Sequence, residues 1–349
     1  SNNLVAAAAG LETANQGFDV VTYTGTGSTQ SISGLNFQPD FVWIKSRSTA
    51  NTAHLLVDSV RGVNKQLGSH STAAETDYSG ISGCVSAFNS DGFDTGGNSD
   101  VATNGRTYVA WAWKAGGAAV SNTDGTITSS VSANSTYGFS ICTYTGTGSS
   151  ATVGHGLGAA PKFVIVKRRN STSDWAVGHD SAGGWNKVLY LNQTASVFTQ
   201  SEPFNATAPS STVISLLDSG STNGSGGTYV AYCWAEVSGF SKFSSYSGSG
   251  ASGNKQTLGF KPGWVMIKCT TTAGNEWTIF DTKRNPSNPA DDYLYANSGN
   301  AEASYSNRKI EVLSDGFQFY GSDQAINTNG DTYIYAAFAG KPDGTIIDS

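Results

Sequence analysis

Charged side chains are scarce in this sequence. They make up 13% of the 349 residues, about half of the roughly 25% usual in soluble domains. The net charge of −6 offers no basic surface for a nucleic acid or an anionic membrane, so we expect neither as a partner. Long apolar runs and a basic secretory leader are also missing, so we expect a soluble, unsecreted chain without membrane insertion.

Cysteine pairs with metal-ligand spacing are absent. Because a lone cysteine in a strand behaves as a small apolar residue, we predict reduced, structural thiols for all four. They are Cys84, Cys142, Cys233 and Cys269.

Catalytic patterns are missing as well. The histidines (His54, His70, His155 and His179) have no HExxH or HxH spacing, and Glu311 stands alone in its predicted strand rather than facing a second carboxylate. We therefore predict no enzymatic activity, no catalytic residue and no metal or cofactor of the usual kinds. A carbohydrate-active hydrolase is the least favoured of the functional hypotheses.

What the sequence does contain is an eleven-residue frame that occurs three times, at 35–45, 157–167 and 258–268. The frame is Leu, three residues, Pro, one residue, an aromatic, Val, one residue, an aliphatic and Lys. Its proline predicts entry into a strand, its apolar run predicts a strand covered on both faces, and its lysine predicts the exit to solvent. The frame residues are Pro39 and Lys45, Pro161 and Lys167, and Pro262 and Lys268.

A second shared element is a strand that ends in aspartate followed by Ser or Thr. We assign Asp58, Asp180 and Asp281 to this position, where the carboxylate can accept backbone N–H groups of the next turn. Arg61 and Arg284 follow three residues after two of them, and we expect each to pair with its aspartate.

Each copy closes on the same kind of strand, at 107–113, 228–234 and 332–338, with alternating residues on opposite faces. Strand signals recur throughout, and no segment has helical periodicity. The fold class predicted is all-β, with three tandem β-sandwich repeats of jelly-roll type, each about 100 residues long. The expected boundaries are an N-terminal arm (1–16), repeats at 17–117, 138–238 and 239–341, a linker (118–137) and a tail (342–349).

The combination TYTGTG, GLxFxPDFVWIK, VDSVRG, SDGF and TYVAWAWKAGG in repeat one resembles a family of repeat-bearing virion structural proteins from tailed phages, especially marine ones. GFSICTYTGTG and TYVAYCWAEV in repeat two, and GFKPGWVMIK, RNPSNP and YLYANSGNAEA in repeat three, resemble later units of that family. The resemblance covers residues 17–342. It implies a particle component with concanavalin-like or laminin-G-like jelly rolls, and it transfers no catalytic residue.

Two kinds of loop residue are candidates for binding. Trp185 lies in a Gly-rich loop and is a candidate glycan contact, with packing over a sandwich edge or at a subunit contact as the alternative. Aspartates in two loops offer the oxygen ligands that Ca²⁺ takes, but their spacing matches no EF-hand and favours local hydrogen bonds. They are Asp91, Asp94 and Asp100, and Asp315, Asp323 and Asp331.

The prediction is a non-enzymatic structural protein of a phage particle: a capsid decoration, spike or tail-fibre component located in the virion after assembly in the host cytoplasm. Its partners would be other virion proteins and further copies of itself, a homotrimer being favoured over an internal pseudo-threefold. The alternative is a receptor protein that binds host-surface glycans through the divergent loops at 61–80, 181–210 and 283–306.

Overall fold

The structure, a computed structural model, describes residues 16–79 and 83–340. Strands account for 43% of the protein and helix for 1%, so the all-β class is confirmed. A single turn of helix, α2 (Ser99–Ala102), is capped by Asn98, whose side chain accepts the Asp100 N–H. The predicted tail and nearly all of the predicted arm lie outside the described residues.

Three antiparallel main sheets share one strand order. In each, the frame strand lies between the closing strand and the strand that follows the frame. The main sheets, in spatial order, are β1 (Phe18–Thr24), β9 (Thr107–Trp113), β3 (Phe41–Ser46) and β4 (His54–Asp58); β12 (Phe139–Thr145), β19 (Thr228–Trp234), β14 (Phe163–Arg168) and β15 (Trp175–His179); and β20 (Ser241–Ser247), β28 (Thr332–Ala339), β22 (Pro262–Cys269) and β23 (Thr278–Asp281).

A smaller sheet accompanies each main sheet, and each pair is called a unit here, numbered 1 to 3 along the chain. The smaller sheets are β2 (Gln30–Ser33), β8 (Gly92–Thr95) and β7 (Val85–Asn89); β13 (Ala151–Gly154) and β18 (Val213–Leu216); and β21 (Lys255–Thr257), β27 (Gly316–Tyr320) and β26 (Lys309–Leu313). The finer description as jelly rolls stays a prediction.

Short strands follow the last main strand of every unit, in the loops predicted to diverge. They are β5 (Lys65–Gln66) and β6 (Thr76–Asp77), β16 (Lys187–Tyr190) and β17 (Phe198–Thr199), and β24 (Asp292–Tyr295) and β25 (Ala303–Ser304). Residues 118–137, predicted to be a linker, contain two strands instead. β10 (Val120–Asn122) and β11 (Ser129–Asn134) form a hairpin, and β11 pairs with β12, so the hairpin extends the main sheet of unit 2. Its Ser- and Thr-rich composition fits a sheet edge that faces solvent.

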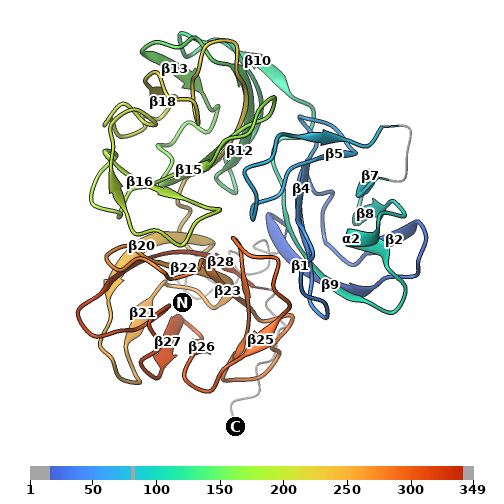
Figure 1. Ribbon diagram of the computed structural model, residues 1–349, viewed down its shortest axis with the longest axis vertical. Coiled ribbons are helices and arrows are strands. Elements are labelled where there is room, and N and C mark those ends of the chain that lie inside the picture. The colour runs from blue at the N-terminus through green and yellow to red at the C-terminus, as the bar shows by residue number, and fades with distance from the viewer. Residues whose placement is uncertain (1–15, 80–82, 341–349) are drawn as a thin grey trace, which may run out of the picture.

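The three units surround a common centre, with the main sheets inside and the smaller sheets outside (Figure 1). Alternation along the frame strand explains why it is apolar on both faces. In β3, Val42 and Ile44 belong to the interior of unit 1, whereas Phe41 and Trp43 belong to the central core. The predicted double burial is therefore confirmed, and its cause is packing between units.

Equivalent rings from the three closing strands meet at this centre. The ring centroids of Trp113 and Trp234 are 6.0 Å apart, those of Trp113 and Phe338 are 5.6 Å apart, and those of Trp234 and Phe338 are 6.5 Å apart. This triangle marks a pseudo-threefold axis within one chain. Each such side chain contributes about 1.5–3 kcal/mol by burial, so the shared centre joins the units into one body.

Candidate functional site: the seams between the units

The three frame lysines are fully buried, so the predicted exit to solvent is wrong. Each ammonium enters a loop of a neighbouring unit. Lys45 Nζ donates to Thr52 Oγ1 at 2.6 Å and to Gly299 O of unit 3 at 3.2 Å. Lys167 Nζ donates to Ser173 O and to Thr72 O of unit 1, and Lys268 Nζ donates to Asn275 O and to Thr194 O of unit 2.

These contacts run in one cyclic direction and define three seams. Unit 2 holds the loop of unit 1, unit 3 holds that of unit 2, and unit 1 holds that of unit 3; we call them seams 1–2, 2–3 and 3–1. Burial lowers the pKa of Lys45, Lys167 and Lys268 to about 8 in every case. Seam 3–1 closes the ring although the chain does not connect unit 3 back to unit 1.

A buried ionic network crosses seam 1–2. Arg61 Nε donates to Asp58 Oδ2 at 2.5 Å, as the sequence predicts, and Arg61 Nη1 donates to Glu75 at 2.9 Å. Glu75 in turn accepts from Arg169 of unit 2, also at 2.9 Å, and Tyr232 of unit 2 donates to Asp58. Burial alone would raise the pKa of Glu75, but the two guanidinium groups outweigh it and the pKa is lowered.

The same network recurs at seam 3–1, where it closes the ring. Arg284 pairs with Asp281 as predicted and with Glu302, and Glu302 accepts from Arg47 of unit 1. Trp111 of unit 1 donates its indole N–H to Asp281 Oδ2 at 3.0 Å, in place of the tyrosine at seam 1–2.

Seam 2–3 has no such network, because all five equivalent side chains are neutral. Strand register places His179 opposite Phe163, where Asp58 and Asp281 stand opposite Phe41 and Trp264. At seam 2–3, Ala182, Val197, Thr270 and Ala336 stand where seam 1–2 has Arg61, Glu75, Arg169 and Tyr232, respectively. His179 Nδ1 accepts the Ser181 N–H, so its Nε2–H donates to Tyr335 O of unit 3 at 3.1 Å.

The strand-end position that the sequence assigns to Asp180 therefore belongs to His179, one residue earlier. Asp180 instead forms a half-exposed ion pair with Lys162 at 2.7 Å. Burial lowers the pKa of His179 to about 4, which keeps the ring neutral at neutral pH.

A ring nitrogen from the strand after the frame also crosses each seam. Trp175 Nε1 donates to Gly68 O and Ser71 O of unit 1, and Trp277 Nε1 donates to Tyr190 O of unit 2. His54 occupies this position in unit 1. Because Trp43 Nε1 donates to His54 Nδ1, the Nε2–H of His54 must donate to Ser298 O of unit 3.

Trp185, the candidate glycan contact, is buried. Its ring packs on Phe204 and over Gly178, where an added Cβ would lie only 2.4 Å from the indole. Its N–H faces Asp180 Oδ1 at 3.4 Å. Only 5% of Trp185 is exposed, so its ring offers no face on which a sugar could stack.

The remaining candidates hold local structure. The four cysteines are buried and free, which confirms structural thiols. In the described ranges, no three His, Cys, Asp or Glu side chains gather as a metal site. Asp94 accepts from Asn89 and Asp323 accepts the Ala325 N–H, which is the local role favoured by the sequence, whereas Asp323 also pairs with Arg308 and Asp315 pairs with Lys255, 60 residues away in the sequence.

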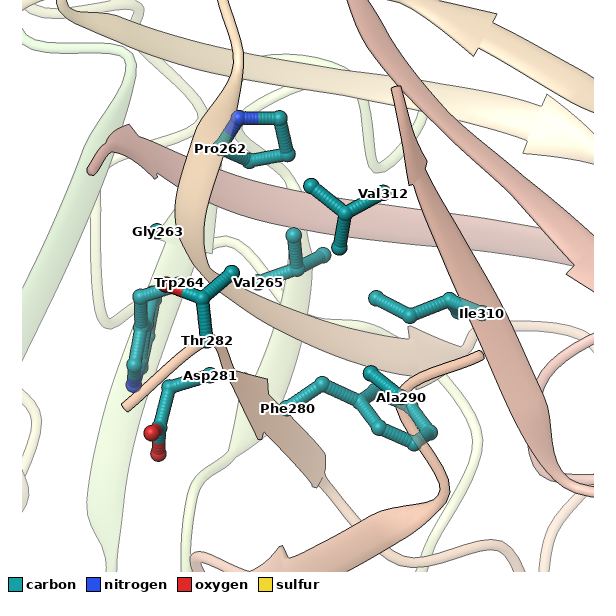
Figure 2. Close-up of a pocket in the computed structure, with 10 residues that line it drawn as sticks. All are labelled: Pro262, Gly263, Trp264, Val265, Phe280, Asp281, Thr282, Ala290, Ile310 and Val312. Carbon is teal, nitrogen blue, oxygen red and sulfur yellow. The ribbon is translucent and has the colours of Figure 1, made fainter. Parts of the chain in front are cut away.

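The pockets among the described residues include a narrow one and a wide one. One in unit 3 is apolar and too narrow for a water molecule, and Figure 2 shows Val265, Phe280 and Ile310 facing one another there while Trp264 points away. A larger open pocket of about 690 Å³ lies between units 1 and 2 and includes Asp40. Both Asp40 oxygens already accept hydrogen bonds, from Ser59 Oγ and the Ala115 N–H.

Sequence reasoning found the Asp–Arg pairs but missed the seam residues Glu75, Arg169 and their counterparts. Two features of the sequence could have indicated them: a lysine follows the buried frame strand in every unit, and a glutamate, Glu75 or Glu302, recurs in two of the divergent loops. No described helix is long and apolar enough to cross a membrane.

The geometry defines a closed, all-β protein of three units whose ionic groups join one unit to the next. The chain belongs to the family described as domain of unknown function (DUF7483), whose model matches residues 13–342. A search of curated proteins found no match.

Proposed function

We propose that this protein is a non-enzymatic structural component of a phage particle, serving as a capsid decoration, spike or tail-fibre protein. The phage context comes from the sequence resemblance. The observation that carries the structural role is the closed ring, in which the buried charged networks and the divergent loops serve to hold units together.

The construction suits a rigid building block. A continuous aromatic core joins the units, and a seam on each side of every unit resists separation, two of the three seams through a buried ionic network. The polar, weakly charged exterior allows close packing against other virion proteins without strong long-range repulsion. A homotrimer would have to form through the outward sheets, because the surfaces that join units are already used within one chain.

Host-glycan binding is the second candidate function. It no longer involves Trp185, and the observation in its favour is a set of exposed aromatic side chains. The exposed fractions are 42% for Phe198, 49% for Tyr305 and 39% for Tyr320. Tyr305 lies three residues before Arg308, whose guanidinium packs over the Tyr293 ring at 4.7 Å.

Locating the chain in purified particles by cryo-electron microscopy tests the proposal. We expect density for the three-unit body on the particle, and defective assembly or reduced stability of particles that lack the protein. A glycan array should show no saturable binding. Absence of the protein from particles would refute the structural role, whereas glycan binding lost in Tyr305→Ala would favour the receptor function.

A further inference from the structure

The outer edges of the three main sheets differ in how they are protected against pairing with another strand. The edge strands are β1 in unit 1, β20 in unit 3 and, because the β10–β11 hairpin extends the sheet, β10 in unit 2. An edge strand exposes backbone N–H and C=O groups to which a further strand can add, and proteins block such edges with charged side chains or a covering segment.

Units 1 and 3 cap the edge with a carboxylate at the same position. Val20 of β1 donates its N–H to Asp19 Oδ1 at 2.8 Å, and Phe243 of β20 donates its N–H to Glu236 Oε2 at 3.2 Å. These two amides are equivalent in strand register, and both point to the free edge. In unit 2 the equivalent residue, Ile141, pairs with β11 instead. The hairpin therefore moves the edge of this sheet outward to β10.

β10 has no such cap. The Ala235 N–H donates to Gly138 O, and hydrogen-bonded pairs alternate in an antiparallel sheet. Carried across β12 and β11, this alternation directs the backbone groups of Val120 and Asn122 to β11, and those of Ser121 to the free edge. No backbone or side-chain group among the described residues pairs with the Ser121 backbone. The strand contains no charged residue, and Val120 is 65% exposed, more than any other large hydrophobic side chain in the described ranges.

We propose that β10 is a strand-addition edge whose partner is β10 of a second copy of this chain, paired antiparallel across a two-fold axis at Ser121. Each Ser121 then donates its N–H to the Ser121 C=O of the other copy, so the exposed backbone groups satisfy one another. Identical edges that pair antiparallel are self-complementary, and two-fold dimers are the commonest homo-oligomers. The main sheets of the two copies of unit 2 become one continuous sheet.

The placement of charge suits this pairing. The charged residue nearest to Ser121 in the sequence is Asp124, three residues away. In the antiparallel arrangement the two Asp124 residues lie at opposite ends of the paired segment, about 15–20 Å apart, which exceeds the screening length of about 8 Å in physiological salt. Three residues per strand make a small interface, so we expect a dimer that forms where copies are concentrated. The pairing does not rest on the proposed function.

Sedimentation velocity of the full chain over a concentration series tests this edge. We expect a reversible shift from the mass of one 36.2 kDa chain towards twice that mass. Ser121→Pro removes the N–H on the free edge and leaves the bonds to β11, because an edge strand tolerates proline where its N–H faces solvent. This variant should keep the fold and lose the shift. Val120→Lys should lose the shift as well, since a charge on an edge strand opposes pairing.

Tyr305→Lys is the matched control, because it places the same charge on an exposed residue of unit 3 and should keep the wild-type shift. A wild-type chain that stays monomeric up to millimolar concentration, or that forms a trimer, would overturn the proposal. So would a shift that persists in Ser121→Pro. Slow hydrogen exchange of the Ser121 amide in the monomer would show that another part of the chain covers the edge, and would also overturn it. The wild-type series decides the matter if a variant fails to fold.

Discussion

Glu75→Val is the sharpest perturbation of a seam, because valine is the residue that seam 2–3 has at the equivalent position. Glu75 lies between two guanidinium groups, at 2.9 Å from Arg61 and 2.9 Å from Arg169. Arg61 is fully buried and keeps Asp58, whereas Arg169 is 20% exposed and loses its charge partner. We expect a loss of about 3 kcal/mol in the free energy of unfolding, from broken charge-assisted hydrogen bonds and an unpaired cation.

Urea unfolding measures this loss, and the chain supplies its own controls. Glu302→Val breaks the same network at seam 3–1 and should cost a similar amount. Arg169→Thr copies Thr270 of the neutral seam, and combining it with Glu75→Val should recover part of the loss because it removes the unpaired cation. A loss below about 1 kcal/mol for Glu75→Val would refute the reasoning. So would a double variant whose loss exceeds the sum of the losses of Glu75→Val and Arg169→Thr.

Three further outcomes are expected. His54 and His179 are buried and neutral with lowered pKa values, so the unfolded chain binds their protons first. Below about pH 6.5, each of the two histidines should lower the free energy of unfolding by up to about 1.4 kcal/mol for every pH unit. Urea midpoints measured over this pH range should therefore fall less steeply for His179→Gln than for the wild type. The Lys167 pKa of about 8 lies below its unfolded value, so its contribution to stability should rise by about 1–2 kcal/mol between pH 7.5 and 9.5, and Lys45 and Lys268 should contribute in the same direction. A pH series on Lys167→Met that shows the full wild-type rise would contradict this. Trp185→Ala should cost about 3–5 kcal/mol by calorimetry, and an unchanged melting temperature would place the ring outside the core.

The sequence predicts the strands well because local patterns determine them. A proline before a run such as Phe41 to Ile44 indicates a strand whatever surrounds it, and alternating large and small residues in the closing strand indicate packing on both faces. The Asp–Arg pairs are equally local, since three residues separate their members.

The errors concern burial and register, which depend on residues far away in the sequence. Lys45 ends its strand as a surface lysine would, and only the loop of unit 3 makes the position buried. Asp180 matches its counterparts by residue type, but strand register assigns the position to His179. Trp185 lies in a loop as predicted, but it is buried, and the signal for this was Gly178 within a strand, where the lack of a side chain allows the close approach of another group.

Hydrogen exchange measured across a urea series tests most directly whether three units sharing one core form a single closed body. Peptides from the closing strands β9, β19 and β28 carry Trp113, Trp234 and Phe338, which meet at the axis. The account predicts that all three strands lose protection at the same urea concentration and with the same free energy. A strand that exchanges well before the other two would show that its unit opens independently, and would contradict the closed ring.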